Sequence, residues 1–161
     1  MTAHFASMDP KLRRVLINVC TMTATVMQAL DTTIANVALP YMQGSLSASL
    51  DQINWVLTSY IVAAAIMTAP MGWLSERFGR KKLFIICVGG FTVASFLCAL
   101  AQNIEQMVLF RLLQGMAGAA LVPLSQSVLL DAYSAEERGQ AMSIWGVGVM
   151  LGPIMGPTLG A

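Results

Sequence analysis

Five long apolar segments, separated by short polar stretches, dominate the hydrophobic pattern of the chain. They cover residues 15–39, 53–74, 83–101, 107–130 and 141–161. A helix needs roughly 20 apolar residues to cross the hydrocarbon core of a bilayer, and each segment is close to that length or longer. The pattern therefore predicts an all-α integral membrane protein. We expect a polar tail over residues 1–14 and a transmembrane domain of five helices over residues 15–161.

The composition agrees with a membrane protein and argues against several soluble classes. Of the 161 residues, 57% are hydrophobic and only 11% are charged, and the mean hydropathy is +0.69. Soluble domains carry about 25% charged residues, so this chain lacks the polar surface of an ordinary soluble enzyme and the polarity of a disordered segment. The formal net charge of +1 gives no basic field to attract nucleic acid, so we expect no nucleic-acid partner.

Side chains suited to catalysis or metal binding are sparse. The three cysteines, Cys20, Cys87 and Cys98, lie in apolar segments without a CxxC pair, which favours buried thiols over a disulfide or a metal site. The single histidine, His4, has no nearby carboxylate or cysteine. Because no nucleophile–base pair or phosphate-binding loop is present either, we expect neither an enzyme nor a bound cofactor or metal.

The positive charges predict how the helices are oriented. Lysine and arginine collect on the cytoplasmic side of membrane proteins, and residues 41–52 and 102–106 contain neither. If the N-terminus lies in the cytoplasm, every loop cation lies on the cytoplasmic side. We therefore expect a multi-pass protein of the cytoplasmic (inner) membrane with this orientation. These cations are Lys11, Arg13 and Arg14 in the tail, Arg77, Arg80, Lys81 and Lys82 after the second segment, and Arg138 after the fourth.

The first segment carries a polar stripe along one helix face. At 100° per residue its members fall within about 80° of arc, and Asp31 lies about 60° from Gln28. Lipid cannot satisfy such a face, so it either forms hydrogen bonds between helices or lines a substrate path. Asp31 favours the path, because a carboxylate at this depth costs about 2.5–3.5 kcal/mol. The stripe comprises Asn18, Thr21, Thr25, Gln28, Thr32 and Asn36.

The fourth segment holds an arginine, Arg111, near its predicted outer end. Gln114, Gly115 and Gly118 follow at three, four and seven positions and share its helix face. Arg111 either extends toward the membrane surface or faces another helix across the space that the glycines leave. Pairing between Arg111 and Asp31 is compatible with the sequence, which does not show whether the two residues lie at the same depth.

Glycines recur every four residues in the fifth segment, at Gly148, Gly152, Gly156 and Gly160. This spacing leaves a groove without side chains along one helix face and predicts close helix packing. Pro153 and Pro157 lie beside the glycines, and each removes an amide donor and loosens the helix locally. We expect a tightly packed seam that also serves as a hinge.

A short charged loop joins the second and third segments. Gly72 and Gly79 permit a tight turn there, and Glu76 lies near a helix C-terminus, where its charge needs a cation. Arg77 and Arg80 are the local cations, with Lys81 following. Positive charge alone would anchor the loop in the cytoplasm, so the fixed arrangement of glycine, acid and cations indicates a more specific role.

Four of these patterns resemble motifs of the major facilitator superfamily. Gly72-x-Leu74-x-Glu76-Arg77-x-Gly79-Arg80-Lys81 is similar to its loop between the second and third helices, where Asp usually stands in place of Glu76. Arg111-x-x-Gln114-Gly115-x-x-Gly118-Ala119-Ala120 resembles the fourth-helix motif, and Gly148-x-x-x-Gly152-Pro153-x-x-Gly156-Pro157 the fifth-helix motif of antiporters. Leu30-Asp31-Thr32-Thr33-Ile34-Ala35-Asn36-Val37-Ala38-Leu39-Pro40 resembles the first helix of fourteen-helix drug:proton antiporters of the EmrB/QacA type.

The resemblance implies roles for these residues. Glu76, Arg77 and Arg80 would form a cytoplasmic charge latch, and Gly148 to Gly160 would form the interface between two helix bundles. Arg111 would take part in proton coupling and Asp31 in proton or substrate binding. Gln28, Thr32 and Gln114 are the further candidates for this path. The energy source would be a proton gradient.

We therefore expect a proton-coupled multidrug efflux antiporter that exports hydrophobic or cationic small molecules, with protons and the lipid bilayer as its other partners. A periplasmic adaptor would be a partner if the source is a double-membrane bacterium. Two alternatives stay open: an exporter of a defined metabolite or siderophore, and a non-transporting membrane fragment or assembly subunit. Fourteen spans would need about 450 residues, so we expect this chain to be the first third of a transporter, unable to transport alone.

Overall fold

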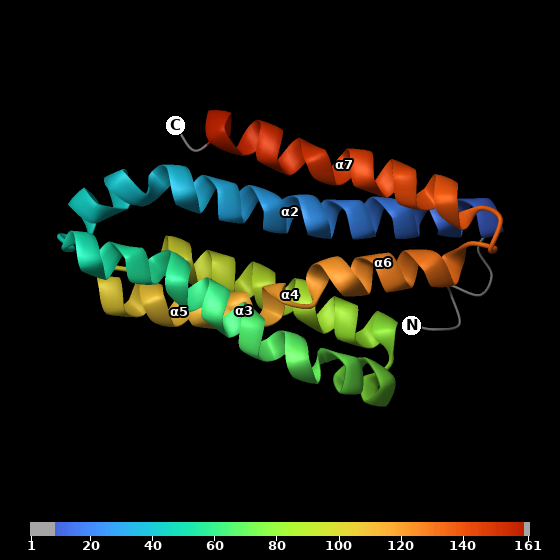
Figure 1. The fold of residues 1–161 in the computed structure, drawn as a ribbon, viewed down its shortest axis with the longest axis horizontal. Coiled ribbons are helices and arrows are strands. Elements are labelled where there is room, and N and C mark those ends of the chain that lie inside the picture. The colour runs from blue at the N-terminus through green and yellow to red at the C-terminus, as the bar shows by residue number, and fades with distance from the viewer. Residues whose placement is uncertain (1–8, 160–161) are drawn as a thin grey trace.

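The computed structural model describes residues 9–159, and this part of the chain consists of helices joined by short turns, with no strand (Figure 1). The helices that cover the first three apolar segments are α2, α3 and α4, and the rest of the described chain forms α5, α6 and α7. Their bounds are Pro10–Ser45 for α2, Leu50–Phe78 for α3, Arg80–Ala99 for α4, Ile104–Gly118 for α5, Leu121–Ala132 for α6 and Arg138–Leu159 for α7.

Local capping explains where several helices begin. The Asp9 side chain accepts a hydrogen bond from the backbone N–H of Lys11 and precedes Pro10, a residue suited to the first helical position. Ser49 and Gln52 satisfy each other's backbone N–H groups in a capping box at the start of α3. Between α3 and α4 the chain turns at Gly79, whose φ of +82° favours glycine.

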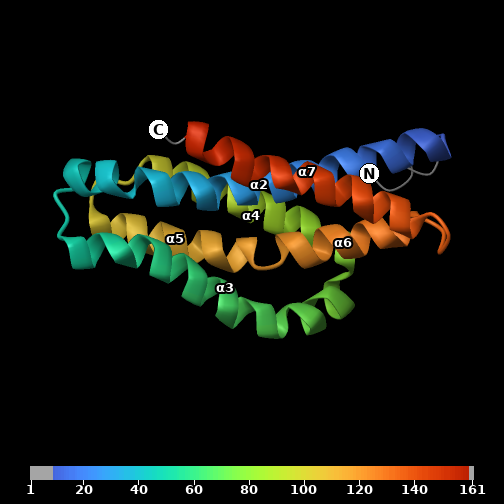
Figure 2. The same cartoon turned by 45° about the horizontal axis from the view of Figure 1, so that its top comes forward.

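The fourth apolar segment differs from the single helix that the pattern suggests. It divides at Ala119–Ala120 into α5 and α6, which run end to end (Figure 2). Pro123 has no N–H to donate to the carbonyl of Ala119, which removes one helical hydrogen bond at this point. The N–H of Leu124 still donates to Ala120 across the break, so the path bends and continues.

Most contacts between helices are made by α2 and α5. The long helix α2 packs against α7 on one side and α6 on another, while α5 packs against α3 and α4 (Figure 1). Phe91, Leu121 and Leu129 are among the fully buried side chains of this interior. Within residues 9–159, three stretches are long and apolar enough to cross a bilayer: Leu50–Phe78, Arg80–Ala99 and Ile104–Ala132.

The outward faces of the helices remain strongly apolar. Large hydrophobic side chains on α3, α4 and α7 are more than half exposed, which suits contact with lipid or with further helices and not with water. They include Ile61, Ile66, Ile85, Ile86, Phe96, Val147, Met150 and Ile154.

The glycine stripe of α7 packs directly on α2. A Cβ at Gly152 would lie 2.5 Å from the Ala29 Cβ, and one at Gly156 would lie 2.5 Å from Thr33, while Gly148 faces Met22. Within this chain the stripe therefore packs on α2, and its place at an interface with a second helix bundle stays a prediction. Pro153 and Pro157 lie inside α7, and Gly160 lies outside the described residues.

Substitution in this stripe tests the contact. We expect Gly152→Ala to destabilise the protein by about 1–3 kcal/mol, because the added methyl group would overlap Ala29. Gly146→Ala on the same helix is the matched control, since a Cβ at Gly146 meets nothing within 4 Å. Thermal unfolding of both variants in the same detergent or lipid measures the difference, and equal melting temperatures would contradict the packing.

Candidate functional site

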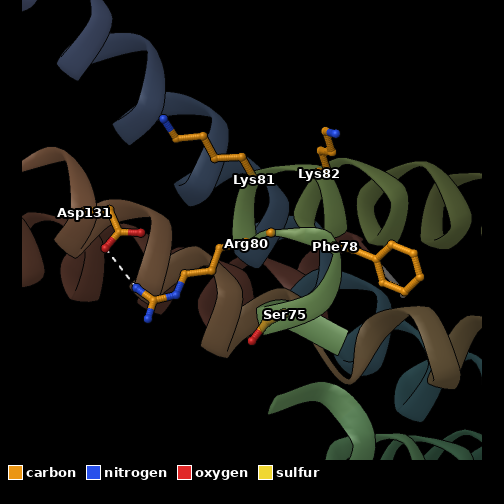
Figure 3. Close-up of a pocket in the computed structure, with 7 residues that line it drawn as sticks. Ser75, Phe78, Arg80, Lys81, Lys82 and Asp131 are labelled. Carbon is orange, nitrogen blue, oxygen red and sulfur yellow. Dashed lines mark hydrogen bonds and ion pairs between the residues drawn. The ribbon is translucent and has the colours of Figure 1, made fainter. Parts of the chain in front are cut away.

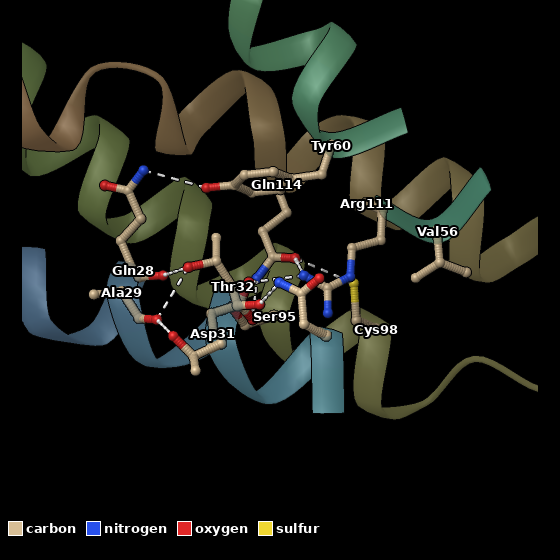
Figure 4. Close-up of polar contacts among 12 residues, drawn as sticks. Gln28, Ala29, Asp31, Thr32, Val56, Tyr60, Ser95, Cys98, Arg111 and Gln114 are labelled. Carbon is tan, nitrogen blue, oxygen red and sulfur yellow. Dashed lines mark hydrogen bonds and ion pairs between the residues drawn. The ribbon is translucent and has the colours of Figure 1, made fainter. Parts of the chain in front are cut away.

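A buried ion pair joins α2 and α5. The Arg111 guanidinium donates from Nη1 to Oδ2 of Asp31 at 2.7 Å (Figure 4). The two side chains are only 8% and 19% exposed, and burying such charges is costly unless they are paired and hydrogen-bonded. The two residues therefore do lie at the same depth, a point that the sequence left open.

Gln114 connects both members of the pair to α4. Its Nε2 donates to Oδ1 of Asp31 at 2.8 Å and to the Ser95 hydroxyl at 2.6 Å. Its Oε1 accepts from Nη1 of Arg111 at 3.0 Å and from the Cys98 thiol at 3.7 Å. Gln114 is completely buried. We call the five residues Asp31, Ser95, Cys98, Arg111 and Gln114 the polar centre.

Glycines allow α5 to approach α3 beside the polar centre. Gly115 lies so close to the Tyr60 backbone that a Cβ there would come within 3.0 Å of the Tyr60 Cα. A Cβ at Gly118 would lie 2.7 Å from the Tyr60 hydroxyl. The sequence predicted that both glycines leave space beside Arg111, and the structure shows that α3 occupies this space.

A second polar contact lies next to the centre, between Gln28 and Tyr60. The Gln28 amide donates to the Tyr60 hydroxyl at 3.2 Å, and its Oε1 is buried without a hydrogen-bond partner. The Nε of Arg111 is likewise buried and unpartnered. Both atoms are available to a polar group of a ligand or to water, because buried polar atoms are normally satisfied.

The two interpretations of the α2 stripe apply to different parts of the helix. Toward its N-terminus the stripe joins helices: Thr25 donates to Ser125 on α6 at 3.1 Å, and Asn18 donates to the Tyr133 hydroxyl at 2.6 Å. Farther along, Gln28 and Asp31 take part in the contacts described above. Thr32 donates to carbonyls of its own helix, at Gln28 and Ala29, and so stays outside the polar centre.

The charged loop between α3 and α4 forms a different pair from the one expected. Arg80 donates to Asp131 at the end of α6 at 2.9 Å (Figure 3), while Arg77 lies over the Trp73 ring at 5.8 Å. Glu76 has no ion-pair partner within 4.0 Å among the described residues. Among the described residues, therefore, no ion pair joins Glu76 to Arg77 or Arg80.

An open pocket lies beside this loop (Figure 3). Its volume is about 400 Å³, and Gly79, Arg80 and Lys81 contribute to its wall together with Asp131. Gly72 lies in α3, where a Cβ would meet nothing within 4 Å. Gly79, with its positive φ, is therefore the glycine that the turn requires.

The N-terminal part of α2 is fastened to the α6–α7 connection. Arg14 pairs with Glu137 at 3.0 Å and lies over the Tyr133 ring at 5.3 Å. Hydrogen bonds from Ser134 hold the pKa of the Glu137 carboxyl below its usual range, and the Arg14 charge adds to this effect. These contacts lie at the same end of the molecule as the Arg80–Asp131 pair.

The sequence did not predict Tyr60, Ser95 or Cys98 as neighbours of Asp31 and Arg111, or Asp131 as the partner of Arg80. Ser95 and Cys98 lie three positions apart on one face of an apolar helix, a weak signal that becomes meaningful only once Gln114 is known to face them. Asp131 follows the fourth apolar segment directly, on the side of the membrane where the sequence places the cationic loop.

Comparison with known proteins gives consistent results. The model of the Major Facilitator Superfamily matches residues 21–161. The chain is 44% identical to the multidrug export protein EmrB of Haemophilus influenzae, over 91% of this chain and 29% of that protein. It is 44% identical to the fatty acid resistance protein FarB of Neisseria gonorrhoeae, over 85% and 27%. Against EmrB of Escherichia coli K12 the identity is 42%, over 91% and 28%. The chain thus spans less than a third of the length of these relatives.

The buried pair makes a quantitative prediction about stability. We expect Arg111→Gln to cost about 3–5 kcal/mol, because it leaves the Asp31 carboxylate buried without its cation. The double variant Asp31→Asn with Arg111→Gln should be more stable than the sum of the two single effects predicts. Chemical or thermal unfolding of all four proteins in lipid measures this coupling, and strictly additive losses would contradict an interacting pair.

Proposed function

The chain belongs to the major facilitator superfamily and is an integral membrane protein, and on this premise we propose that it is part of a proton-coupled multidrug efflux antiporter. The observation that carries the proposal is the buried Asp31–Arg111 pair inside the polar centre. Ionisable residues within a membrane domain are costly and mark ion or substrate pathways. EmrB of Haemophilus influenzae and EmrB of Escherichia coli, both named multidrug export proteins, support the substrate class.

Asp31 is the proposed proton-binding group. The Arg111 guanidinium lies 2.7 Å from its Oδ2, so a proton that binds Asp31 would replace this ion pair. A hydrophobic cation that approached Asp31 would compete with both Arg111 and the proton. The binding of drug and of proton would therefore exclude each other at one carboxylate, which is the requirement for exchange.

Gln28 and Thr32 lie on the same part of α2 as Asp31 and are the proposed wall of the substrate path. Gln28 contributes the free buried carbonyl oxygen described above. In this family, rocking of helix bundles around a central site gives access from alternate sides of the membrane. We assign five membrane spans to this chain, an N-terminus in the cytoplasm and a place in the inner membrane. Protons, drugs and, in a double-membrane bacterium, a periplasmic adaptor are the partners.

The cytoplasmic loop is the proposed latch of this cycle. Arg80 and Asp131 connect the α3–α4 turn to the end of α6, and Glu76, Arg77 and Lys81 are the other proposed members of the latch. The α7 seam of Gly148, Gly152 and Gly156 holds that helix on α2 and would restrict leakage beside the path. Pro153 and Pro157 supply its flexibility.

A narrower substrate range is the second candidate. FarB, named a fatty acid resistance protein, has the same 44% identity to this chain as EmrB of H. influenzae, over a slightly shorter part of it. An exporter of fatty acids or of another defined metabolite would use the same proton site with a different substrate wall. A screen that finds one saturable amphipathic acid and no drug phenotype would favour this candidate.

Loss of the carboxylate tests the proposed function. In the complete protein we expect Asp31→Asn to reduce drug resistance to that of cells without the protein, because the variant cannot exchange a proton. Asp51→Asn, an exposed carboxyl in the first turn of α3, is the matched control. Growth inhibition by hydrophobic cations, with equal membrane levels of each variant, measures the effect. Full resistance in Asp31→Asn would remove the assigned role.

A second prediction separates stability from transport at the loop. The Arg80–Asp131 pair is about half exposed, so Asp131→Asn should change stability by no more than about 1 kcal/mol. If the pair is a latch, the same substitution should lower the rate of drug efflux clearly. Unfolding and efflux measured on one preparation distinguish the two effects, and unchanged efflux would leave the pair as a surface contact only.

A further inference from the structure

The side-chain amide of Gln114 uses both its donor and its acceptor atoms. Nε2 donates to Asp31 and Ser95, and Oε1 accepts from Arg111 and Cys98. Figure 4 shows the amide between the carboxyl of α2 and the guanidinium of α5. Every hydrogen-bonding position of this amide is therefore filled in the structure, and its orientation is fixed by its neighbours.

These contacts fit an ionised Asp31. A carboxylate accepts hydrogen bonds through both oxygens and donates none. Here Oδ1 faces an N–H of Gln114 at 2.8 Å and Oδ2 faces an N–H of Arg111 at 2.7 Å. After proton uptake Asp31 carries an O–H that needs an acceptor, and both of these neighbours present donors.

Reversal of the Gln114 amide removes this mismatch. A half-turn about its last side-chain bond places the carbonyl oxygen toward Asp31, where it accepts the new O–H. The α4 partners tolerate both orientations, because the Ser95 hydroxyl and the Cys98 thiol each donate or accept. After the reversal, the Ser95 O–H donates to the amide carbonyl, and the Cys98 sulfur accepts from the amide N–H.

The reversal has a direct consequence for Arg111. The atom that accepts from Nη1 of Arg111 at 3.0 Å is replaced by an N–H, so two donors face each other. Arg111 therefore loses two partners together: the carbonyl acceptor of Gln114 and the negative charge of Asp31. Since Nε of Arg111 already has no acceptor, the guanidinium then has few contacts left that hold it in place.

We propose that Gln114 is a proton-sensing switch whose amide reverses when Asp31 is protonated and thereby releases Arg111. Ser95 and Cys98 are the positioning residues that stabilise both orientations. The inference rests on the proposed function, in which Asp31 takes up the transported proton. It assigns to α4 a part in coupling that none of the sequence motifs covers.

Within the described residues, the other charged side chains of α3, α4 and α5 lie in the terminal turns of these helices: Asp51, Glu76 and Arg77 on α3, Arg80, Lys81 and Lys82 on α4, and Glu105 on α5. Besides Arg111 on α5, the titratable groups near Asp31 are Tyr60 on α3 and Cys98 on α4. The charged residues of α6 and α7 are Asp131 and Arg138, at the opposite end of the bundle. A pH response of the Gln114 amide therefore reports chiefly on Asp31.

Solid-state NMR of the complete protein in lipid bilayers tests the switch. Glutamine labelled with ¹⁵N and aspartate labelled with ¹³C allow the dipolar contact between Gln114 Nε2 and Asp31 Cγ to be followed against pH. The Asp31 carboxyl shift reports protonation in the same sample. The contact between Gln114 Nε2 and Asp31 Cγ should be strong while Asp31 is ionised. It should weaken at the same pH midpoint as the change in the Asp31 carboxyl shift. The Gln114→Met variant assigns the signal.

Two results would overturn the switch. One is a contact that persists unchanged after Asp31 is protonated. The other is an Asp31 carboxyl that stays ionised over the whole pH range in which the protein remains folded. The first result leaves proton-coupled export intact if Asp31→Asn still abolishes efflux, so failure of the switch and failure of the proposed function are distinguishable.

Variants of α4 test the positioning residues. Ser95→Ala should weaken the Gln114–Asp31 contact at high pH, because the amide loses its shortest hydrogen bond, and Ser95→Thr should restore it. Thr92→Ala is the matched control, since the Thr92 hydroxyl bonds only to the carbonyl of Val88 on its own helix. If the Gln114–Asp31 contact is as strong in Ser95→Ala as in Thr92→Ala, Ser95 does not position the amide.

Discussion

The buried charge pair between Asp31 and Arg111 is the constraint on which the rest of this structure depends. Two charges placed among apolar helices must be paired and must have their remaining hydrogen bonds satisfied. Gln114 meets most of that requirement by contacting both charges at once. One helical turn from Arg111, Gly115 allows α5 to lie directly on the α3 backbone. The chemistry of one ion pair thus explains the small residues and the amide around it.

Two polar regions lie at opposite parts of α4. Arg80 is the first residue of this helix and binds Asp131, while Ser95 and Cys98 near its end hold Gln114. A rise of 1.5 Å per residue separates Arg80 from Ser95 by about 22 Å. The α3–α4 loop and the polar centre are therefore connected by α4, and α5 and α6 lead from the polar centre back to Asp131. The proposed latch and the proposed proton site thus lie on the same helices.

Much of the architecture could be predicted from the sequence because lipid restricts what a chain can do. Length and periodicity indicated the apolar helices, and the cost of buried charge singled out Asp31 and Arg111. Their pairing could not be predicted, because depth depends on how α2 and α5 pack. Ser95 and Cys98 escaped notice, since an isolated small polar residue in an apolar helix does not reveal what it faces. The glycine stripe predicted close packing, but its partner, α2, is a property of the assembled fold.

The central claim is that the Asp31 carboxyl exchanges its proton for a drug. The most direct measurement adds a transported hydrophobic cation to the complete protein in lipid, in weakly buffered solution near the midpoint of Asp31 protonation, and records the protons released. The account predicts a release that saturates together with drug binding and that disappears in Asp31→Asn while the protein stays folded. Equal release from both proteins, or drug binding to the native protein without any release, would contradict it.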